Sequence, residues 1–590
     1  MKNLLKIFSS KDNIFLVAVL FFAFLVRIIY LGQFPIGMTH DELNNIFAAK
    51  SLFWTFSFPP GTAPAILPIN MSNFTITIPE VPALFLAPLV GPLQSSMFNA
   101  RIAGAILSVL SVLAIYFIVL HITKKRIYAQ LSMLIMAINP WSILMGRTMC
   151  ELNFFIAFFL WGFLILINSR GWKMFSAIPF YLLGFFSYTG GQISFLIFVI
   201  ITLIYRYFLS VKDRRNLGVY AVFLGLFSLI FVGYIFIVTK NQSFKVRNGE
   251  IYLPNLPQIA ETVDGERKLS VPTPLNSLFT NKATVYINGF ISKYINTFSV
   301  NTLFLNGETR AVFSYQTHGT FYLIDLLFIV IGISALFSIN KKGWLLCLAV
   351  LIGCSVTSGL SVIESSYSQR VGLIYPFLIM LSGIGVGTIV SVAKSTKTQK
   401  ILISIIAIFY LLSFINLMYI YFIRFPVYAS DGWFFQDRVL SNYLRKTKQV
   451  YPDAKIYVYT SEPKIIFEEY LFYTNSYTRN NATSINNKLN TMNYSINDIV
   501  FTDKCPGKNI DKESFVIFEG SLACSKTSQD TNPIRITRLK DVLENYLIYN
   551  DKLCNGVDLN RYVPQSAYQD FSLERQSINK FCSNWITIIE

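Results

Sequence analysis

GMTHDELNNIFAAK, residues 37–50, follows closely on an apolar run, NIFLVAVLFFAFLVRIIYLG at 13–32. The run is long enough to cross a bilayer as a helix, so the adjacent carboxylates Asp41 and Glu42 stand where the chain leaves the membrane. Thr39 and Glu42 have the spacing of a capping box, in which a threonine caps a helix and a glutamate three residues later bonds back to it. The capping box explains Glu42 and leaves Asp41 without a structural role.

The composition of the whole chain is that of a membrane protein. Of its 590 residues, 53% are hydrophobic and only 14% are charged, and the mean hydropathy is +0.49. A soluble protein cannot cover so much apolar surface. We therefore predict a polytopic α-helical membrane protein with about 11 transmembrane helices. The spans are expected at residues 14–32, 101–121, 127–145, 152–168, 174–190, 192–210, 217–238, 321–339, 343–358, 371–392 and 401–423.

Basic residues between the spans predict the orientation. Short cytoplasmic loops collect Lys and Arg, and here the N-terminus and every second connection are basic. The connections are KKR at 124–126, SRGWK at 169–173, KDRR at 212–215, KK at 341–342 and KSTKTQK at 394–400. This alternation predicts a multi-pass protein of the plasma (inner) membrane, with a cytoplasmic N-terminus and with the long connections 33–100 and 239–320 outside. The net charge of +18 then reflects orientation, and no nucleic-acid partner is expected.

The composition changes near residue 424, which divides the chain into a membrane domain, 1–423, and a C-terminal domain, 424–590. The second part has ordinary polar content. KIYVYTS at 455–461 and SFVIFEG at 514–520 are typical of strands, and PKIIFEEYLFYTNSY at 463–477 is typical of a helix. We expect a small α/β domain, and the basic-loop alternation makes it extracytoplasmic.

Four of the seven cysteines lie in this C-terminal domain. An even number of cysteines in an extracytoplasmic domain favours disulfides. Order along the chain favours the pairs Cys505–Cys524 and Cys554–Cys582, and four free thiols are the alternative. The other three cysteines lie in or beside spans, where a thiol is typically a small buried hydrophobe.

Charged side chains cost about 2.5–3.5 kcal/mol at the centre of a spanning helix, so they are rare there. A transporter is expected to hold its ionisable groups nearer mid-span. The layout here favours an enzyme that works at the outer membrane surface, although each arginine alone is also typical of a headgroup anchor. The charged residues at predicted outer ends are Arg27, Asp41, Glu42, Arg101, Arg147, Glu151 and Arg370.

Two further stretches add to this pattern. NPWSILMGRTMCELNFF at 139–155 places Arg147 and Glu151 four residues apart, on one helical face if the helix has already begun. SSYSQRVGLIYPFL at 365–378 places Arg370 at the outer start of a span. Together with the Asp41 loop, these residues predict an anion-binding site at the membrane interface.

Several segments also resemble one enzyme family. THDELNNIFAAKSL, TIPEVPALFLAPLVG, NPWSILMGRTMCELN and FFSYTGGQ resemble the lipid-linked-sugar glycosyltransferases of the GT-C fold. This group includes the protein O-mannosyltransferases and the aminoarabinose transferases, known as family 39 glycosyltransferases. FLNGETRAVFSYQTHGTFYLIDLLFIVIGI and YFIRFPVYASDGWFFQDRVLSNYL resemble later segments of bacterial members. The resemblance covers nearly all of residues 14–445 and does not extend into the rest of the C-terminal domain.

The resemblance implies that a sugar, a hexose or pentose, moves from a polyprenyl-phosphate donor to a glycan, lipid or protein acceptor on the outer face, with inversion. Such a site needs a carboxylate to take the acceptor proton and cations to stabilise the leaving phosphate. On this interpretation Asp41 is the base, and Glu42 accompanies it as a cap or supporting contact. Arg147 and Arg370 bind the donor phosphate, and Glu151 orients Arg147.

Two supporting residues follow from the FFSYTGGQ segment. Tyr188 is placed to stack on a sugar ring. Some family members have an arginine shortly after the SYT sequence, and Gln192 stands near that place here, so a donor contact becomes neutral or is missing. A metal cofactor is not required by the pattern, because the three histidines have no paired ligand spacing. A divalent ion held by His40, Glu80 and Asp41 is the alternative.

Two other functions stay open from the sequence. A transporter or flippase of lipid-linked sugar is expected to show inverted repeats and broken helices. A non-catalytic envelope scaffold would work through its C-terminal domain and would tolerate loss of Asp41. The resemblance and the outer charges favour the glycosyltransferase.

Overall fold

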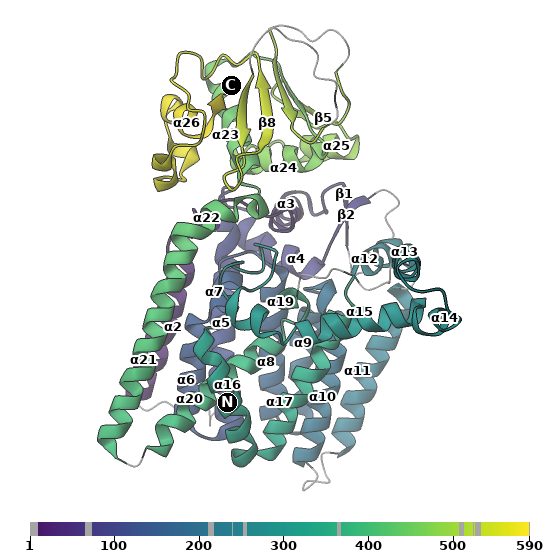
Figure 1. Cartoon of the computed structure of the whole chain (residues 1–590), viewed down its shortest axis with the longest axis vertical. Helices are drawn as coiled ribbons and strands as arrows, with labels where there is room; N and C mark the ends of the chain where they lie inside the picture. The colour runs from purple at the N-terminus through teal and green to yellow at the C-terminus, as the bar shows by residue number, and fades with distance from the viewer. Residues whose placement is uncertain are drawn as a thin grey trace.

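The computed structural model describes residues 10–64, 74–210, 217–238, 240–251, 256–362, 367–393, 395–506, 513–522, 524 and 533–588. Long helices form the body of the molecule, and a smaller domain with a β-sheet lies at one end of it (Figure 1). The chain is therefore a polytopic helical protein with a C-terminal α/β domain, as the sequence predicts.

Every predicted span coincides with one or more helices. Within the described residues, seven helices are long and apolar enough to cross a membrane, and an eighth span results if the bent pair α6 and α7 counts as one. The number of about 11 spans stays a prediction, because the other apolar helices are shorter. The helices at the predicted spans are α2 (Ser10–Ile28), α5 (Met97–Thr123), α6 (Arg126–Ile138), α7 (Pro140–Gly146), α8 (Glu151–Asn168), α9 (Ile178–Phe185), α10 (Gln192–Ser210), α11 (Leu217–Val238), α16 (Leu323–Ile339), α17 (Lys341–Cys354), α18 (Val356–Leu360), α20 (Ile374–Val392) and α21 (Thr396–Tyr419).

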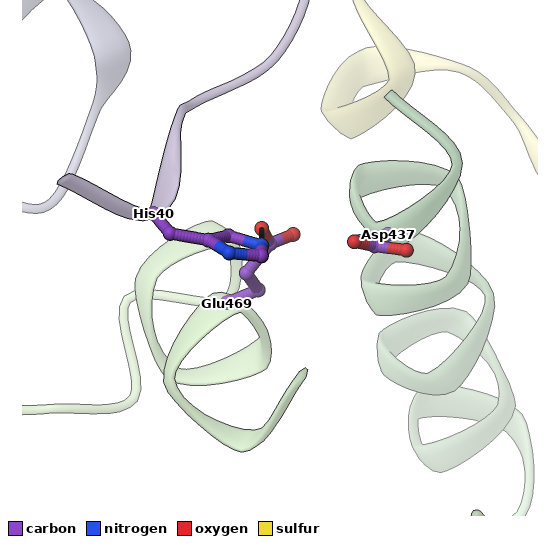
Figure 2. Close-up of side chains that lie close together, drawn as sticks. All are labelled: His40, Asp437 and Glu469. Carbon is purple, nitrogen blue, oxygen red and sulfur yellow. Dashed lines mark ion pairs between the residues drawn. The ribbon is translucent and has the colours of Figure 1, made fainter. Parts of the chain in front are cut away.

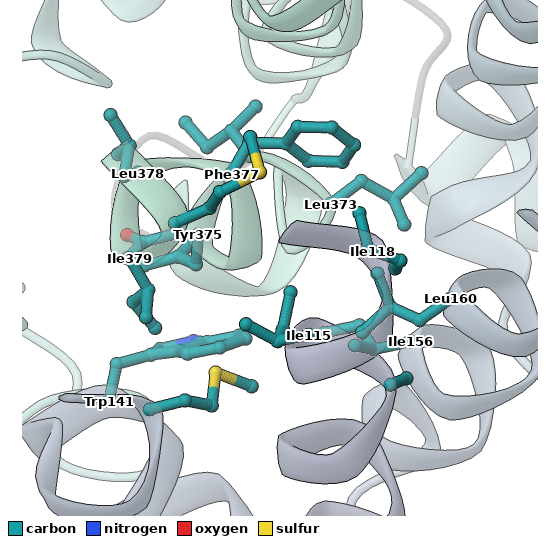
Figure 3. Close-up of a cluster of buried hydrophobic side chains, with 14 of the residues drawn as sticks. Ile115, Ile118, Trp141, Ile156, Leu160, Leu373, Tyr375, Phe377, Leu378 and Ile379 are labelled. Carbon is teal, nitrogen blue, oxygen red and sulfur yellow. The ribbon is translucent and has the colours of Figure 1, made fainter. Parts of the chain in front are cut away.

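The pair α6 and α7 bends by 58° at Asn139. Pro140 cannot continue the hydrogen bonding of α6, and the Asn139 side chain caps α7 by accepting a bond from the Ser142 amide at 3.1 Å. Trp141, which follows Pro140, is buried and stacks on Tyr375 with ring centroids 4.6 Å apart. Figure 3 shows both residues in a buried hydrophobic cluster. The bend is therefore packed inside the helical body.

Small residues let two central helices approach closely. A Cβ atom added at Gly332 of α16 would collide with the Leu381 carbonyl, and one at Gly385 of α20 would collide with the Phe328 carbonyl. Close backbone approach through small residues is typical of packed membrane helices. This contact fixes α16 against α20 within the body.

Both long connections lie on the side of the helical body that carries the α/β domain (Figure 1). The first contains α3 (His40–Thr55), the parallel strands β1 (Gly61–Pro64) and β2 (Phe74–Ile78), and α4 (Glu80–Val90). The second contains α12 (Gln242–Ile251), α13 (Leu256–Lys268), α14 (Leu275–Phe279) and α15 (Lys282–Asn296). Apolar side chains are strongly exposed around α14, at Leu269, Val271, Leu275, Leu278 and Phe279.

The C-terminal domain begins with α22 (Phe425–Tyr428) and α23 (Phe435–Val450). Its seven-stranded sheet has the order β4-β5-β3-β6-β8-β7-β9. The central strand β3 (Ile456–Tyr459) pairs in parallel with β5 (Ile499–Thr502) and β6 (Phe515–Glu519), and β8 (Glu544–Tyr549) runs antiparallel to β6. The stretches predicted as strands form β3 and β6, and the predicted helix forms α24 (Pro463–Tyr473). The remaining elements are α25 (Ala482–Asn490), α26 (Ile578–Trp585), β4 (Ser495–Ile496), β7 (Ile534–Thr537) and β9 (Thr587–Ile588).

Two disulfides cross-link this domain. Cys505 is bonded to Cys524, and Cys554 is bonded to Cys582. These are the pairs that chain order favours, and they close loops with sequence separations of 19 and 28 residues.

Candidate functional site

The predicted capping box starts α3. The Glu42 amide donates to Thr39 Oγ1 at 3.2 Å, and the Thr39 amide donates to Glu42 Oε2 at 3.1 Å. The same buried carboxylate accepts bonds from Arg101 Nε and Nη2, both at 3.0 Å, and from the Met149 amide at 2.7 Å. Glu42 therefore ties α3 to α5 and to the turn before α8. This is the cap or supporting contact expected of Glu42, and both of its carboxylate oxygens are already bonded.

Asp41 has the opposite environment. Its side chain is exposed, and its carboxylate makes no hydrogen bond or ion pair with any residue that the structure describes. It lines a cavity of about 440 Å³ together with Arg310, Phe434 and Lys540. It also borders a small void of about 20 Å³ with Glu151 and Gln369. Asp41 therefore offers a free proton acceptor to a ligand in the larger cavity.

Glu151 lies beside Asp41, as the first residue of α8. Asn45 connects the two, because its Nδ2 donates to the Asp41 carbonyl at 2.9 Å and to Glu151 Oε1 at 3.2 Å. Asp41, Glu80 and Arg247 are close enough to Glu151 to interact with it electrostatically. Three carboxylates and one arginine thus lie near one another. Asp41 and Glu80 come from the first outer connection, Glu151 from the start of α8, and Arg247 from α12.

Arg147 is placed away from this cluster. It is fully buried and donates to the Tyr421 hydroxyl at 2.8 Å, the Val26 carbonyl at 2.8 Å and the Ile29 carbonyl at 2.7 Å. These carbonyls belong to the last turn of α2 and to the residue that follows it, so the guanidinium caps the C-terminal end of that helix. The expected pair with Glu151 does not form, because α7 ends at Gly146 and α8 begins only at Glu151, so the two residues share no helical face. The geometry gives Arg147 a structural role instead of the expected phosphate contact.

Arg370, in the short helix α19 (Tyr367–Arg370), keeps free donors. It is buried, and Nη1 donates to the Tyr188 hydroxyl at 3.0 Å, while Nε has no partner. No described carboxylate forms an ion pair with it. The guanidinium packs on Gly190, where a Cβ atom would collide with it. A buried guanidinium without a counter-charge favours an anionic ligand.

Of the two supporting residues, Tyr188 contacts this arginine. Tyr188 is buried and bonds Arg370, so its hydroxyl is used, and its ring packs edge-on against Phe155 at a centroid distance of 5.8 Å. This places Tyr188 as a partner of Arg370 and not as an exposed platform for a sugar ring. Gln192 is buried at the first residue of α10, beside Tyr234.

Sequence reasoning missed two cations that face Asp41. Arg310 lines the 440 Å³ cavity and also a second cavity of about 680 Å³, which α13 and α15 border. Lys540, from the C-terminal domain, lines the first cavity. Arg310 lies inside the FLNGETRAV segment that resembles family members, so that segment held a signal for it. No local pattern marks Lys540.

His40 also lines the cavity beside Asp41, and its ring lies close to side chains of the C-terminal domain. Among the described residues it meets Asp437 of α23 and Glu469 of α24, and not the expected partners Glu80 and Asp41 (Figure 2). Burial lowers the pKa of His40 to about 4, although the neighbouring Asp41 opposes this change. Any metal site that includes His40 is therefore different from the one the sequence suggested.

No family model matches the chain, nor does any curated protein. Among solved structures it is similar to the Archaeoglobus fulgidus oligosaccharyltransferase tethered with an acceptor peptide containing the NVT sequon, at 12% identity and a TM-score of 0.46, over 79% of this chain and 63% of that one. It is also similar to ArnT from Cupriavidus metallidurans bound to undecaprenyl phosphate, at 11% identity and a TM-score of 0.42, over 92% of this chain and 99% of that one.

A third similar structure is the archaeal oligosaccharyltransferase AglB from Archaeoglobus fulgidus in complex with an inhibitory peptide and a dolichol-phosphate. It shares 11% identity at a TM-score of 0.43, over 92% of this chain and 74% of that one. The chain spans less than two thirds of the length of two of the oligosaccharyltransferase structures, 63% and 64%. The activity of this chain is therefore inferred from its own residues.

Proposed function

We propose that this protein is a membrane glycosyltransferase that moves a sugar from a polyprenyl-phosphate donor to an acceptor hydroxyl on the outer face of the membrane. The observation that carries the proposal is the contrast between two adjacent carboxylates. Glu42 is buried and fully bonded, whereas Asp41 is exposed, has no described partner and borders a cavity of about 440 Å³. A free carboxylate with cations across a cavity is what transfer from a phosphate requires.

In this reaction Asp41 accepts the proton of the acceptor hydroxyl while that oxygen attacks the anomeric carbon. The bond from the anomeric carbon to the phosphate oxygen breaks, and the polyprenyl phosphate leaves with the bonding electrons. Attack from the face opposite the phosphate inverts the anomeric carbon. Glu42 and Asn45 position the Asp41 backbone through the bonds that start α3.

The leaving phosphate gains negative charge, so a cation next to it stabilises the transition state. Arg310 is suited to this role because it borders both the Asp41 cavity and the cavity beside α13 and α15. Arg370, with its unpaired Nε, is the second candidate. The apolar side chains exposed around α14 provide a surface that a prenyl tail or the bilayer can cover.

The test compares cells that express the wild-type protein with cells that express Asp41→Asn at equal levels. Mass analysis of lipid-linked sugars and envelope glycans is expected to show accumulation of one lipid-linked sugar, and loss of its glycan product, in the variant. The proposal would be refuted if wild-type and Asp41→Asn cells had the same lipid-linked sugars and the same envelope glycans. The purified protein then allows release of polyprenyl phosphate to be measured directly with the donor so identified.

A further inference from the structure

Three ionisable side chains meet where the first outer connection touches the C-terminal domain. His40 comes from the start of α3, Asp437 from α23 and Glu469 from α24, and Figure 2 shows them directed toward one another. One ligand atom from each lies within 4.8 Å of the others. His40 Nε2 and Glu469 Oε1 are 4.0 Å apart, which is too long for a hydrogen bond.

This cluster lacks the partners that buried charges need. Glu469 is 0% exposed, and neither of its carboxylate oxygens has a hydrogen-bond partner. His40 Nε2 is also buried without a partner. No described Lys or Arg forms an ion pair with Asp437 or Glu469. Two buried carboxylates without a counter-charge are strongly unfavourable, so the cluster must either take up protons or bind a cation.

We propose that His40, Asp437 and Glu469 bind a divalent transition-metal ion, with Zn²⁺ as the fitting member of that class. Imidazole nitrogen and carboxylate oxygen are both zinc ligands in proteins, and three protein ligands with a water molecule complete a four-coordinate site. Ca²⁺ and Mg²⁺ prefer oxygen ligands alone. The proposal is independent of the glycosyltransferase function, since it concerns how two parts of the chain are held together.

The surroundings are those of a supported site. The Tyr546 hydroxyl donates to Asp437 Oδ1 at 2.6 Å, which leaves Oδ2 without a bond to a described residue. The His40 ring stacks on Phe434, with centroids 3.7 Å apart, which fixes the plane of the imidazole. Partners of this kind orient metal ligands. Tetrahedral geometry with bonds of about 2.1 Å separates the ligand atoms around Zn²⁺ by roughly 3.4 Å. The ligand atoms of the three side chains therefore need to approach one another by about 1 Å on binding the ion.

Without an ion the same groups hold protons. Burial raises the pKa of Asp437 to about 7, and it raises the pKa of Glu469 well above the ordinary value, with Asp437 adding to the effect. An ion that displaces these protons would fix α3 against α23 and α24. Because His40 precedes Asp41 in the chain, the site would also fix the position of the proposed base.

The test uses the full chain purified without chelators. We expect about one zinc per chain by elemental mass spectrometry, and a raised melting temperature when Zn²⁺ is returned to protein stripped with EDTA. Co²⁺ in place of Zn²⁺ is expected to give visible d–d absorption. Glu469→Gln and Asp437→Asn should each lower the Zn²⁺ affinity at least tenfold, and Tyr546→Phe should lower it less.

Glu468→Gln is the matched control. Glu468 is the adjacent buried carboxylate on α24, and it pairs with Lys464 at 4.0 Å, outside the cluster. The control should keep the zinc and the Co²⁺ absorption. Wild-type protein without bound metal, and without a thermal shift on adding Zn²⁺, would overturn the proposal and leave a protonated carboxyl pair. Equal loss of zinc from Glu468→Gln and Glu469→Gln would overturn the ligand assignment.

Discussion

Arg101 holds Glu42 with two parallel hydrogen bonds, from Nε to Oε1 and from Nη2 to Oε2, both 3.0 Å long. Both side chains are buried, and the Arg101 Nη1 also donates to the Pro35 carbonyl at 2.8 Å. The fork joins α5 to the start of α3 and closes the loop that precedes it. Glu42 therefore fixes where Asp41 stands, and the two adjacent carboxylates divide structure and chemistry between them.

Asp41→Asn and Glu42→Gln should separate these roles. Asp41→Asn removes an exposed acceptor without described partners, so the melting temperature should stay near that of the wild type while the transfer rate falls by about 10²–10⁴. Glu42→Gln leaves Arg101 buried without its counter-charge and should destabilise the protein by about 3 kcal/mol. Thermal unfolding and transfer kinetics of both purified variants check this. An inactive but fully stable Glu42→Gln would contradict the division.

Arg147→Lys should act on stability. The ammonium keeps the charge but cannot reach Tyr421 and the two α2 carbonyls together, because it lacks the planar fork of the guanidinium. We expect a loss of about 1–3 kcal/mol and an unchanged donor KM in the folded fraction. Unfolding curves together with donor titrations check this result. A raised donor KM at wild-type stability would return Arg147 to the donor site.

Local patterns were sufficient for much of the fold. The capping box between Thr39 and Glu42 predicts the start of α3, because all its bonds lie within four residues. Short runs of β-branched and aromatic residues predict β3 and β6, and the longer apolar runs predict where helices form. Proline and asparagine at 139–140 nevertheless split one predicted span into α6 and α7, which an apolar average over that window does not detect.

The site was less predictable, because it depends on contacts between distant segments. Arg147 and Arg370 look alike in sequence, each at an end of an apolar run. Arg147 meets Tyr421, 274 residues away, and donates to carbonyls at the end of α2. Among the described residues, the Arg370 guanidinium has one hydrogen bond, to Tyr188. The cluster of His40, Asp437 and Glu469 likewise exists only because the C-terminal domain lies against α3.

Acid should weaken the packing around Arg438, which is paired within the C-terminal domain and also bonded to the first outer connection. Arg438 donates to Glu574 Oε1 and Oε2 at 3.0 and 2.9 Å, and to the Ile36 carbonyl at 2.6 Å. Burial alone would raise the pKa of Glu574, but Arg438 outweighs it and lowers the pKa to about 2. A depressed folded-state pKa stabilises the protein above the ordinary value of 4.5, and this stabilisation is lost as the pH falls toward 2.

Melting temperatures measured between pH 7 and pH 2 test this linkage. Glu574→Gln should be less stable than the wild type at pH 7 and should lose less stability on acidification. Glu544→Gln serves as the control, because Glu544 forms a looser pair with Arg535 at 3.7 Å. Parallel acid curves for the wild type and Glu574→Gln would rule out this pair as the acid-sensitive contact.

The Cys554–Cys582 disulfide should stabilise the C-terminal domain. It closes a loop with a sequence separation of 28 residues, for which the chain-entropy model gives about 3.5 kcal/mol. The double variant Cys554→Ser and Cys582→Ser should unfold at a lower denaturant concentration, followed by the domain's aromatic fluorescence. Thiol labelling of denatured, unreduced wild-type protein should find none of the four domain cysteines reactive, and labelling of all four would contradict both bridges.

Arg370 is the arginine whose substitution should affect turnover. Its buried guanidinium has one described bond, to Tyr188, so a phosphate can occupy its remaining donors. Arg370→Lys keeps the charge but loses the planar fork of the guanidinium, so we expect kcat/KM for the donor to fall by about 10–100-fold. Part of this loss should fall on kcat, because the leaving phosphate gains charge in the transition state. Tyr188→Phe should show a smaller defect that is not additive with Arg370→Lys, since both act through one contact. Kinetics of the single and double variants test whether Arg370 contacts the donor phosphate. If Arg370 only anchored α19, both variants would change the melting temperature and leave kcat/KM unaltered. Arg310 would then remain as the phosphate ligand.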